Sequence, residues 1–426
     1  MKIIVITLIM LSCIKPAYAY VDPGTGSMLF SIVLSICSIL FFIGVSLYEK
    51  IKLYLFRDKA AQKSNYPVVI YTEDKRYFHV FNDIIDEFEN RQYPLMVFVS
   101  SDDDPFLKKE YKFVKVENIG KGNKAFSKLA FMSADVCLMT TPGLDVYQLR
   151  RSKYVKHYSH IFHCLDEGTT YRLFGLDYYD SVMLNFEESK KYIRELEQKR
   201  NLPAKELVVI GSPFMDSMAR AVPANIKGEK TTVLLAPSWG DSAILANYGE
   251  QLIQKLSLTP FITIIRPHPQ SLISEKKLIA TLQEKFAGCE NIKWDLSNNN
   301  LQAMASADVL ITDFSSIIYE FLFLFNKPCI YSLSAYNREL YDLSDLDSGR
   351  TYRDSILERI GKELTLENIG NIEELVDSLV KNSNSSDEIL KVKNEIWQEQ
   401  NNGAKNVVDF LIRKQNEVVN KNDNII

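Results

Sequence analysis

Short runs of β-branched and aromatic residues alternate with longer stretches of helical periodicity along this chain, from Tyr66 onward. This alternation is typical of α/β proteins, in which each strand of a parallel sheet is followed by a helix that covers it. The predicted strands form two series. The first series is 68–71, 95–100, 113–116, 136–139, 155–163, 181–184 and 207–210, and the second is 232–236, 261–266, 291–294, 309–312 and 328–331.

A polar segment rich in proline and glycine separates the two series, between Gly211 and Lys230. It predicts two Rossmann-like domains that face each other across a cleft, over residues 66–222 and 223–412. Ligands of such sheets bind beyond the carboxyl ends of the strands, so the residues that follow each strand are the candidate site residues. The remainder, 413–426, is polar and predicts a frayed tail.

The N-terminus predicts membrane segments. Residues 1–19 have the positive start, the short apolar run and the Ala-Tyr-Ala ending of a signal peptide. Residues 28–48 carry no charge until Glu49 and predict a transmembrane helix. Five basic residues follow within 50–63, so the positive-inside rule places residues 50–426 in the cytoplasm, whether the first segment is cleaved or retained. The prediction is a protein of the bacterial inner membrane with cytoplasmic domains.

Composition narrows the class of protein. Of the 426 residues, 46% are hydrophobic and 24% are charged, which is typical of a core-forming chain, and the net charge of −4 argues against nucleic acid as a partner. The six cysteines show no C-x-x-C spacing, which favours buried free thiols. Cys164 is a less favoured candidate nucleophile because it adjoins His163.

The first motif is TDFSS, residues 312–316, at the end of a predicted buried strand. Ser315 is predicted to cap the apolar helix that follows, and the backbone N–H groups of its first turn would then form an anion site. The hydroxyls of Ser315 and Ser316 would add donors for a diphosphate. The alternative is an ordinary serine cap beside a solvated Asp313.

The second motif is RPHP, residues 266–269. Side chains alternate along a strand, so Arg266 and His268 are predicted to point to the same side. A guanidinium and an imidazole at a strand end suit phosphate binding and protonation of a leaving group. The alternative is a structural ion pair.

Three of the five histidines lie at 157, 160 and 163. On a strand, His157 and His163 would share a face but lie roughly 20 Å apart, and His160 would face the other way, so a metal site is not predicted. His163 lies where the strand enters a polar loop, a position suited to a general base. Asp166 and Glu167 are its orienting partners or rival bases, and a surface histidine is the alternative.

A weaker motif follows the first strand of the second series. Pro237, Ser238 and Trp239 would line a nucleotide pocket, or Trp239 would only pack. The junction segment GSPFMD, residues 211–216, closes the first series in a similar way.

Taken in this order, the motifs resemble the CDP-glycerol glycerophosphotransferase family of teichoic-acid synthesis. TDFSS with Glu320 is similar to the family's T-D-Y-S-S-x-x-x-[DE] signature, RPHP to R-x-H-P, and APSW at 236–239 to A-P-T-W. GSPFMD matches the family's G-x-P-R-x-D only in part. The segment 162–164 corresponds to W-H-G, with Phe162 and Cys164 replacing tryptophan and glycine, and Gly240 stands where the family has an arginine.

The resemblance implies a GT-B-like fold whose second domain holds the donor's cytidine diphosphate. It implies that His268, Ser315 and Ser316 bind the donor's phosphates, that Asp313 and Glu320 support that pocket, and that His163 is the acceptor-activating base. In the expected reaction Arg266 would help to stabilise the charge on the phosphate oxygens. We therefore expect a membrane-associated transferase that moves glycerol phosphate, or a related polyol phosphate, from a CDP-linked donor to a polymeric or lipid-linked envelope acceptor and releases CMP. No cofactor or metal is expected. The alternatives are a GT-B glycosyltransferase using a nucleotide sugar and a catalytically inactive membrane-tethered scaffold.

Overall fold

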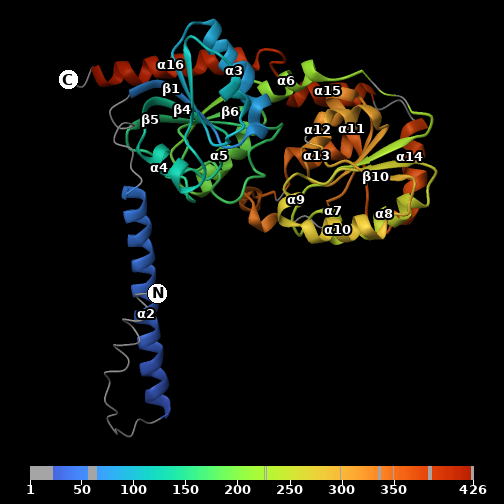
Figure 1. The fold of residues 1–426 in the computed structure, drawn as a ribbon, viewed down its shortest axis with the longest axis horizontal. Helices are drawn as coiled ribbons and strands as arrows, with labels where there is room; N and C mark the ends of the chain where they lie inside the picture. Colours follow the sequence, from blue (N-terminus) through green and yellow to red (C-terminus); the bar gives the residue numbers. More distant parts are fainter. Residues whose placement is uncertain are drawn as a thin grey trace. The chain divides into compact units, whose positions relative to one another are not determined.

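The computed structural model describes residues 23–55, 65–224, 226, 228–297, 299–333, 337–348, 350–381 and 386–423. The chain divides into two compact units, one within Met1–Arg57 and one within Asp58–Ile426. The second unit contains two parallel β-sheets covered by helices (Figure 1), which we call the first lobe and the second lobe. The predicted α/β fold with two Rossmann-like halves is confirmed.

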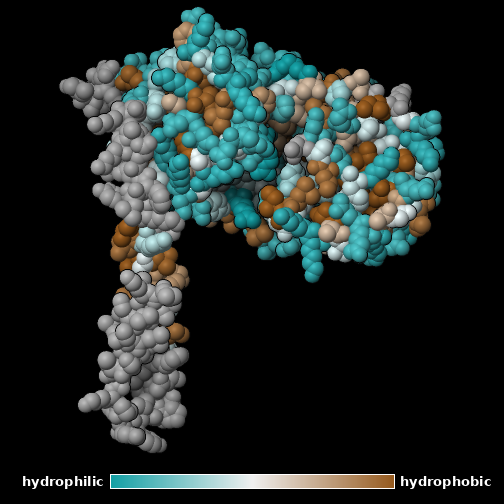
Figure 2. Space-filling view, viewed as in Figure 1, coloured by the Kyte–Doolittle hydropathy of each residue, from teal (hydrophilic) through white to brown (hydrophobic). Residues whose placement is uncertain are grey.

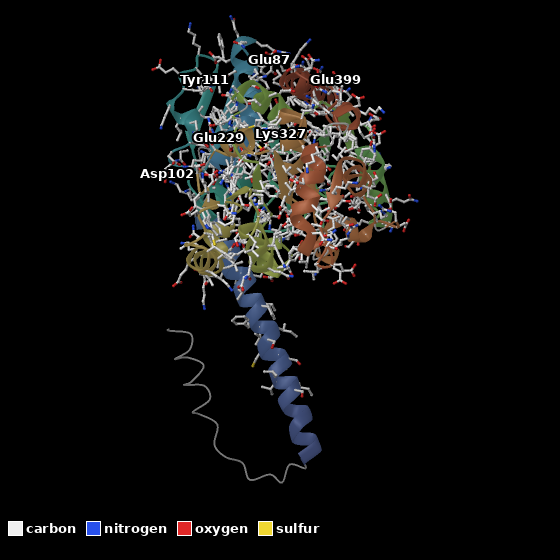
Figure 3. All side chains as sticks on the ribbon, turned by 90° about the vertical axis from the view of Figure 1, so that its right-hand side faces the viewer. Glu87, Asp102, Tyr111, Glu229, Lys327 and Glu399 are labelled. Atoms are coloured by element: carbon white, nitrogen blue, oxygen red, sulfur yellow. The ribbon has the colours of Figure 1, made fainter. Side chains whose placement is uncertain are left out.

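The first unit contributes one long helix, α2 (Pro23–Leu55). Its segment Ser31–Tyr48 is long and apolar enough to cross a membrane, and none of it is buried against protein. The described side chains of this helix project to both sides of it in Figure 3. The predicted span 28–48 lies within α2, whereas the predicted signal peptide 1–19 lies outside the described residues.

The first lobe is built on a parallel sheet with the strand order β3-β2-β1-β4-β5-β6-β7. Its strands are β1 (Asn65–Thr72), β2 (Leu95–Val99), β3 (Val114–Asn118), β4 (Ser133–Met139), β5 (Val155–Ile161), β6 (Ser181–Leu184) and β7 (Glu206–Val209). Strands β1, β2 and β4 are almost continuous runs of buried apolar residues, because helices cover both faces of the sheet. Helix α3 (Phe78–Asn90) lies on one face, and α4 (Asn123–Phe131) and α5 (Ser189–Lys199) lie on the other.

The second lobe has a parallel sheet with the order β10-β9-β8-β11-β12-β13. Its strands are β8 (Thr232–Leu235), β9 (Ile262–Ile265), β10 (Ile292–Trp294), β11 (Val309–Thr312), β12 (Cys329–Tyr331) and β13 (Gly361–Glu363). Helices α8 (Gly249–Ser257), α10 (Lys276–Lys285) and α14 (Ile372–Lys381) cover one face, and α11 (Leu301–Ser306), α12 (Ile317–Phe325) and α13 (Tyr352–Ile360) cover the other. The edge strand β13 was not predicted, because its short Gly-Lys-Glu sequence lacks a strand pattern.

Short helical segments lie in the connections and carry several side chains discussed below. They are η1 (Lys75–Tyr77), η2 (Pro105–Lys108), α7 (Ile244–Asn247), α9 (Ser271–Ser274), η3 (Arg338–Leu340), η4 (Asp342–Asp345) and η5 (Ile369–Asn371).

The end of the chain returns to the first lobe, which corrects two predictions. Helix α15 (Ser386–Ile396) packs in the second lobe, whereas α16 (Gly403–Asp423) inserts Val407, Val408 and Leu411 into the core of the first lobe (Figure 1). The domain boundary at 412 and the frayed tail from 413 are therefore wrong over the described residues. This segment is polar in overall composition, but it carries apolar residues at helical spacing. These residues are buried only because the helix packs on the sheet of the first lobe.

The segment between the lobes is held by a buried carboxylate. Asp216 lies in α6 (Pro213–Ala221) and accepts hydrogen bonds from Trp397 Nε1 at 3.0 Å, Asn401 N at 2.9 Å and Gly403 N at 3.1 Å. These contacts fix the turn between α15 and α16 against the junction. Gly211, just before α6, has φ +84°, and a Cβ there would lie 2.6 Å from Gln398 O. The partial junction motif thus has a structural purpose.

Both sheets change their winding direction at their centre, between β1 and β4 in the first lobe and between β8 and β11 in the second. Open α/β sheets bind ligands beyond the carboxyl ends of the strands at such a switch point. The segments that follow these strands begin at Glu73, Thr140, Ala236 and Asp313.

Candidate active site

A cavity of about 550 Å³ is lined by both lobes, where the surface is indented between them (Figure 2). The first lobe contributes Arg76 and His79 from the segment after β1, with Phe214 and Met218 from α6. The second lobe contributes residues that follow β8, β9, β10 and β11 and two residues of α12, and these include Pro237, Arg266, His268, Asn300, Ser315, Ser316 and Glu320. Most of the predicted donor-site residues therefore meet in one place. His163, Ser238, Trp239 and Asp313 lie outside the lining.

His163 follows β5 and lies next to this cavity. Its ring packs on Tyr77 with 5.3 Å between centroids, and Tyr77 directly follows Arg76. Its Nδ1 lies 3.4 Å from Thr140 Oγ1, at the carboxyl end of β4. Burial lowers the pKa of His163, with Asp166 acting in the opposite sense and Arg76 adding to the decrease. At neutral pH the imidazole is therefore unprotonated and able to accept a proton.

The two carboxylates after His163 hold its loop and do not bond to its ring. Asp166 accepts from Gly168 N at 2.6 Å and from the Thr170 hydroxyl, and Glu167 accepts from Arg353 N at 3.0 Å. Glu167 thereby joins the first lobe to α13. The orienting partner of His163 is Thr140, which has no sequence motif and was missed.

Cys164 is not equipped to be a nucleophile. Burial raises the pKa of its thiol, with the Ser316 side chain of the other lobe acting in the opposite sense, so the reactive thiolate is disfavoured.

His268 lies in the loop after β9 and stacks on Trp239, with 6.4 Å between ring centroids. Its Nδ1 accepts the Gln270 N–H at 3.1 Å, so in the neutral ring Nε2 carries the proton. Burial, with further contributions from Arg76 and His163, lowers the pKa of His268 to about 4. A neutral Nε2–H donor suits hydrogen bonding to a phosphate better than protonation of a leaving group.

Arg266 lines the cavity, but its guanidinium is already engaged. Nη1 binds Asp295 Oδ2 at 2.5 Å, and Nη2 donates to Ser297 O at 2.7 Å. Strand β9 ends at Ile265, so the strand alternation from which we placed Arg266 and His268 on one side does not extend to them. Arg266 braces the loop after β10, and its free donor capacity is smaller than predicted.

The start of α12 differs from the predicted cap. The helix begins at Ile317, and its N-cap is Ser316, whose side chain makes no capping hydrogen bond, so the cap assigned to Ser315 is wrong. Asp313 and Phe314 lengthen the turn and move the helix start by one residue. Ser315 and Ser316 line the cavity at the start of α12.

Asp313 is buried behind the cavity wall. Its Oδ1 accepts from Ser238 N at 2.8 Å and its Oδ2 from Ile244 N at 3.0 Å. It therefore holds the 238–244 segment, including the half-exposed Trp239, against β11. Burial raises the pKa of Asp313 to about 6, while the backbone donors act in the opposite sense. Asp313 thus supports the pocket and makes no direct contact with it.

Glu320 is the acidic side chain among the described residues of the lining. Its Oε2 accepts from Asn300 Nδ2 at 2.8 Å, and burial raises its pKa to about 7. Near neutral pH it exists in both protonation states.

Sequence reasoning missed Arg76, Thr140, Asn300 and Arg353. Arg353 bridges the lobes, because its backbone N–H bonds to Glu167 and its guanidinium donates to Phe314 O. Arg76 and Thr140 could have been selected from the sequence because each follows a strand at the centre of the first sheet. Among the residues that the structure describes, no group of three or more histidine, cysteine or acidic side chains is arranged to hold a metal ion.

Comparison with known proteins agrees with this arrangement. Residues 173–412, more than half of the chain, match the family model described as CDP-glycerol:poly(glycerophosphate) glycerophosphotransferase. A histidine-to-asparagine variant of the wall teichoic acid polymerase TagF, soaked with CDPG, is a similar solved structure, with 14% identity, a TM-score of 0.54 and coverage of 90% of this chain and 97% of that one.

Two further solved structures share the fold. The UDP-GlcNAc 2-epimerase from Neisseria meningitidis has 15% identity, a TM-score of 0.51 and coverage of 82% of this chain and 100% of that one. MnaA of S. aureus, solved with UDP, has 12% identity, a TM-score of 0.54 and coverage of 82% and 96%. No curated protein matches the sequence. By the extent of the family match, the chain is an enzyme that belongs to the CDP-glycerol:poly(glycerophosphate) glycerophosphotransferase family.

Proposed function

We propose that this enzyme transfers glycerol phosphate, or a related polyol phosphate, from a CDP-linked donor to a polymeric or lipid-linked acceptor of the cell envelope, with release of CMP. The observation that carries the proposal is the cavity between the lobes. His268, Ser315 and Ser316 line its second-lobe wall, and His163 lies beside its first-lobe wall.

The chemistry is an in-line displacement at the phosphorus that bears the glycerol. The acceptor hydroxyl oxygen forms a bond to that phosphorus, its proton passes to His163, and the bond from phosphorus to the bridging oxygen breaks, so that CMP leaves with the bonding electrons. His268 Nε2–H, the serine hydroxyls and the amide groups at the start of α12 bind the phosphate oxygens, on which negative charge increases.

The membrane part of the proposal depends on α2. The apolar segment Ser31–Tyr48 would anchor the enzyme in the bacterial inner membrane, and the basic residues that follow it favour a cytoplasmic location for both lobes. A CDP-linked donor is charged and water-soluble, so it would reach the lobes from the aqueous phase. An anchored enzyme can meet a lipid-linked acceptor at the membrane surface.

The direct test is a donor screen with the detergent-purified full chain. CDP-glycerol, CDP-ribitol, UDP-N-acetylglucosamine and a CMP-linked sugar are each incubated with envelope acceptor, and nucleotide release is measured by chromatography. Release of CMP from a CDP-polyol that depends on the acceptor supports the proposal. Turnover of a nucleotide sugar alone would establish the glycosyltransferase alternative, and no turnover of any donor would favour the scaffold.

We expect kcat/KM for the CDP-linked donor to depend on pH with two limbs. The rising limb lies below pH 6.5, because His163 accepts a proton only when neutral and its pKa is lowered, chiefly by burial. A falling limb near pH 7 is expected from Glu320, because burial raises its pKa to about 7 and its carboxylate repels the diphosphate above that value. Initial rates between pH 5 and 9 measure both limbs.

The variant Glu320→Gln provides the control for the pH profile. It keeps an acceptor for Asn300 Nδ2 and cannot ionise, so the falling limb should move to higher pH and the rising limb should stay in place. A falling limb that persists unchanged in this variant would rule out Glu320 as its origin.

A further inference from the structure

Arg76 lies where the first lobe meets the donor-binding wall of the second. It follows β1, one of the two strands that flank the switch point of the first sheet, and it lines the cavity opposite the second lobe. Its charge acts on the histidines of both lobes: burial is the main cause of the lowered pKa of His268, and Arg76 lowers the pKa of both His268 and His163 further. Arg76 is therefore within electrostatic reach of both imidazoles.

Hydrogen bonds to Asp74 hold the backbone N–H and Nε of Arg76 and leave its two terminal nitrogens, Nη1 and Nη2, available to a ligand. Asp74 Oδ1 caps η1 by accepting from Arg76 N at 2.9 Å and also accepts from Arg76 Nε at 2.9 Å. Among the described residues, no protein group accepts a hydrogen bond from Nη1 or Nη2 of Arg76. The side chain is 49% exposed, so its cation is not buried by protein.

Arg266, the other arginine of the lining, is in the opposite condition. Both of its terminal nitrogens are occupied, by Asp295 Oδ2 and by Ser297, and its side chain is only 8% exposed. A diphosphate diester carries two negative charges, and Glu320 adds a third when it ionises. The second-lobe wall offers neutral hydrogen-bond donors and Arg266, which is already paired with protein groups. The guanidinium that can still bind a phosphate through both terminal nitrogens is therefore that of Arg76, from the first lobe.

We propose that Arg76 binds the phosphate that is transferred, with Nη1 and Nη2 donating to its two non-bridging oxygens. This inference rests on the proposed function. It assigns the nucleotide-linked phosphate to the second lobe and the transferred phosphate to an arginine of the first lobe. Because Tyr77, the residue after Arg76, packs on the His163 ring, Arg76 would hold the reacting phosphorus near the base that activates the acceptor.

Calorimetric binding to the detergent-purified full chain tests the assignment, with CDP-glycerol and CMP as probes. CMP lacks the transferred phosphate. In Arg76→Gln, the affinity for CDP-glycerol should fall roughly 10- to 100-fold, as expected for the loss of a bidentate charged contact, while the affinity for CMP stays within about twofold. Arg76→Lys keeps the charge without the fork and should lie between the wild type and Arg76→Gln.

Lys75→Gln is the matched control. Lys75 is the neighbouring cation, exposed and paired with Asp103 at 2.5 Å, and its loss should change neither affinity. Unchanged affinity for CDP-glycerol in Arg76→Gln, or equal losses for both probes, would overturn the assignment. If Arg76→Gln unfolds at a lower temperature than the wild type, the affinities of Arg76→Lys for CDP-glycerol and CMP are compared instead, and a loss confined to CDP-glycerol supports the assignment.

The same measurements separate this inference from the proposed function. A wild-type enzyme that binds CDP-glycerol but transfers nothing would refute the proposed reaction, and the difference between the two probes would still decide the role of Arg76. A wild-type enzyme that does not bind CDP-glycerol would overturn both.

Discussion

Replacing His163 by glutamine is expected to lower kcat for glycerol phosphate transfer roughly 10²- to 10⁴-fold, the usual contribution of a positioned general base. Glutamine fills a similar volume and can still bond to the Thr140 hydroxyl, which lies 3.4 Å from Nδ1 in the wild type, so the fold should be retained. The affinity for CDP-glycerol should change little, because the donor's phosphates are assigned to other side chains. Steady-state rates, calorimetric affinity and a thermal melt measure the three quantities.

His157→Gln is the matched control for this prediction. His157 lies on β5, the strand that precedes His163, is buried, and bonds through Nε2 to Ser181 Oγ at 2.9 Å, away from the cavity lining. Its replacement should lower stability and leave kcat near the wild-type value. A His163→Gln enzyme that retains more than a tenth of the wild-type kcat would exclude His163 as the base.

Replacing Asp313 by alanine is expected to destabilise the protein by about 2–5 kcal/mol and to abolish measurable binding of CDP-glycerol. The stability loss follows from two backbone N–H groups that lose their charged acceptor, the buried one of Ile244 and the partly buried one of Ser238, at about 1–3 kcal/mol each. Binding is lost because the released 238–244 segment carries Trp239, on which His268 stacks. Denaturant unfolding and calorimetry measure the two effects.

Asp308→Ala is the corresponding control at the other end of the same strand. Asp308 Oδ2 accepts from Thr232 N at 2.9 Å, at the amino end of β11 and β8. Its removal therefore costs one hydrogen bond and leaves the contacts of the 238–244 segment in place. It should lower stability by about 1–3 kcal/mol and leave the affinity for CDP-glycerol unchanged. Equal losses of affinity in both variants would show that Asp313 acts through general stability alone.

The motifs identified the second-lobe wall better than they identified the roles of its residues. Arg266, His268, Ser315, Ser316 and Glu320 were selected as residues that follow predicted strands or lie in the next helix, and the structure brings all five to one cavity. Their hydrogen bonds depend on residues that are distant in sequence. The loop at 295–297 pairs with Arg266, and the turn after β11 moves the helix start from the predicted serine to Ile317.

The first-lobe wall was harder to predict because its contacts come from separate loops. Thr140, Tyr77 and His163 follow three different strands and meet only because β1, β4 and β5 are neighbours in the sheet. Asp166 and Glu167 adjoin His163 in sequence and were expected to act on it. The loop turns their carboxylates towards Gly168, Thr170 and Arg353 instead.

The amino-acid sequence alone determined the two α/β lobes, the long apolar helix and the strand ends at which the candidate site is built, because these features depend on periodicity and on local backbone preferences. The tertiary structure decided which charges remain available for a ligand and which are consumed within the protein. It paired Arg266, buried Asp313 and returned α16 to the first lobe, and among the described residues it left Nη1 and Nη2 of Arg76 without a protein acceptor. Such outcomes depend on contacts between residues tens to hundreds of positions apart, and no local pattern encodes them.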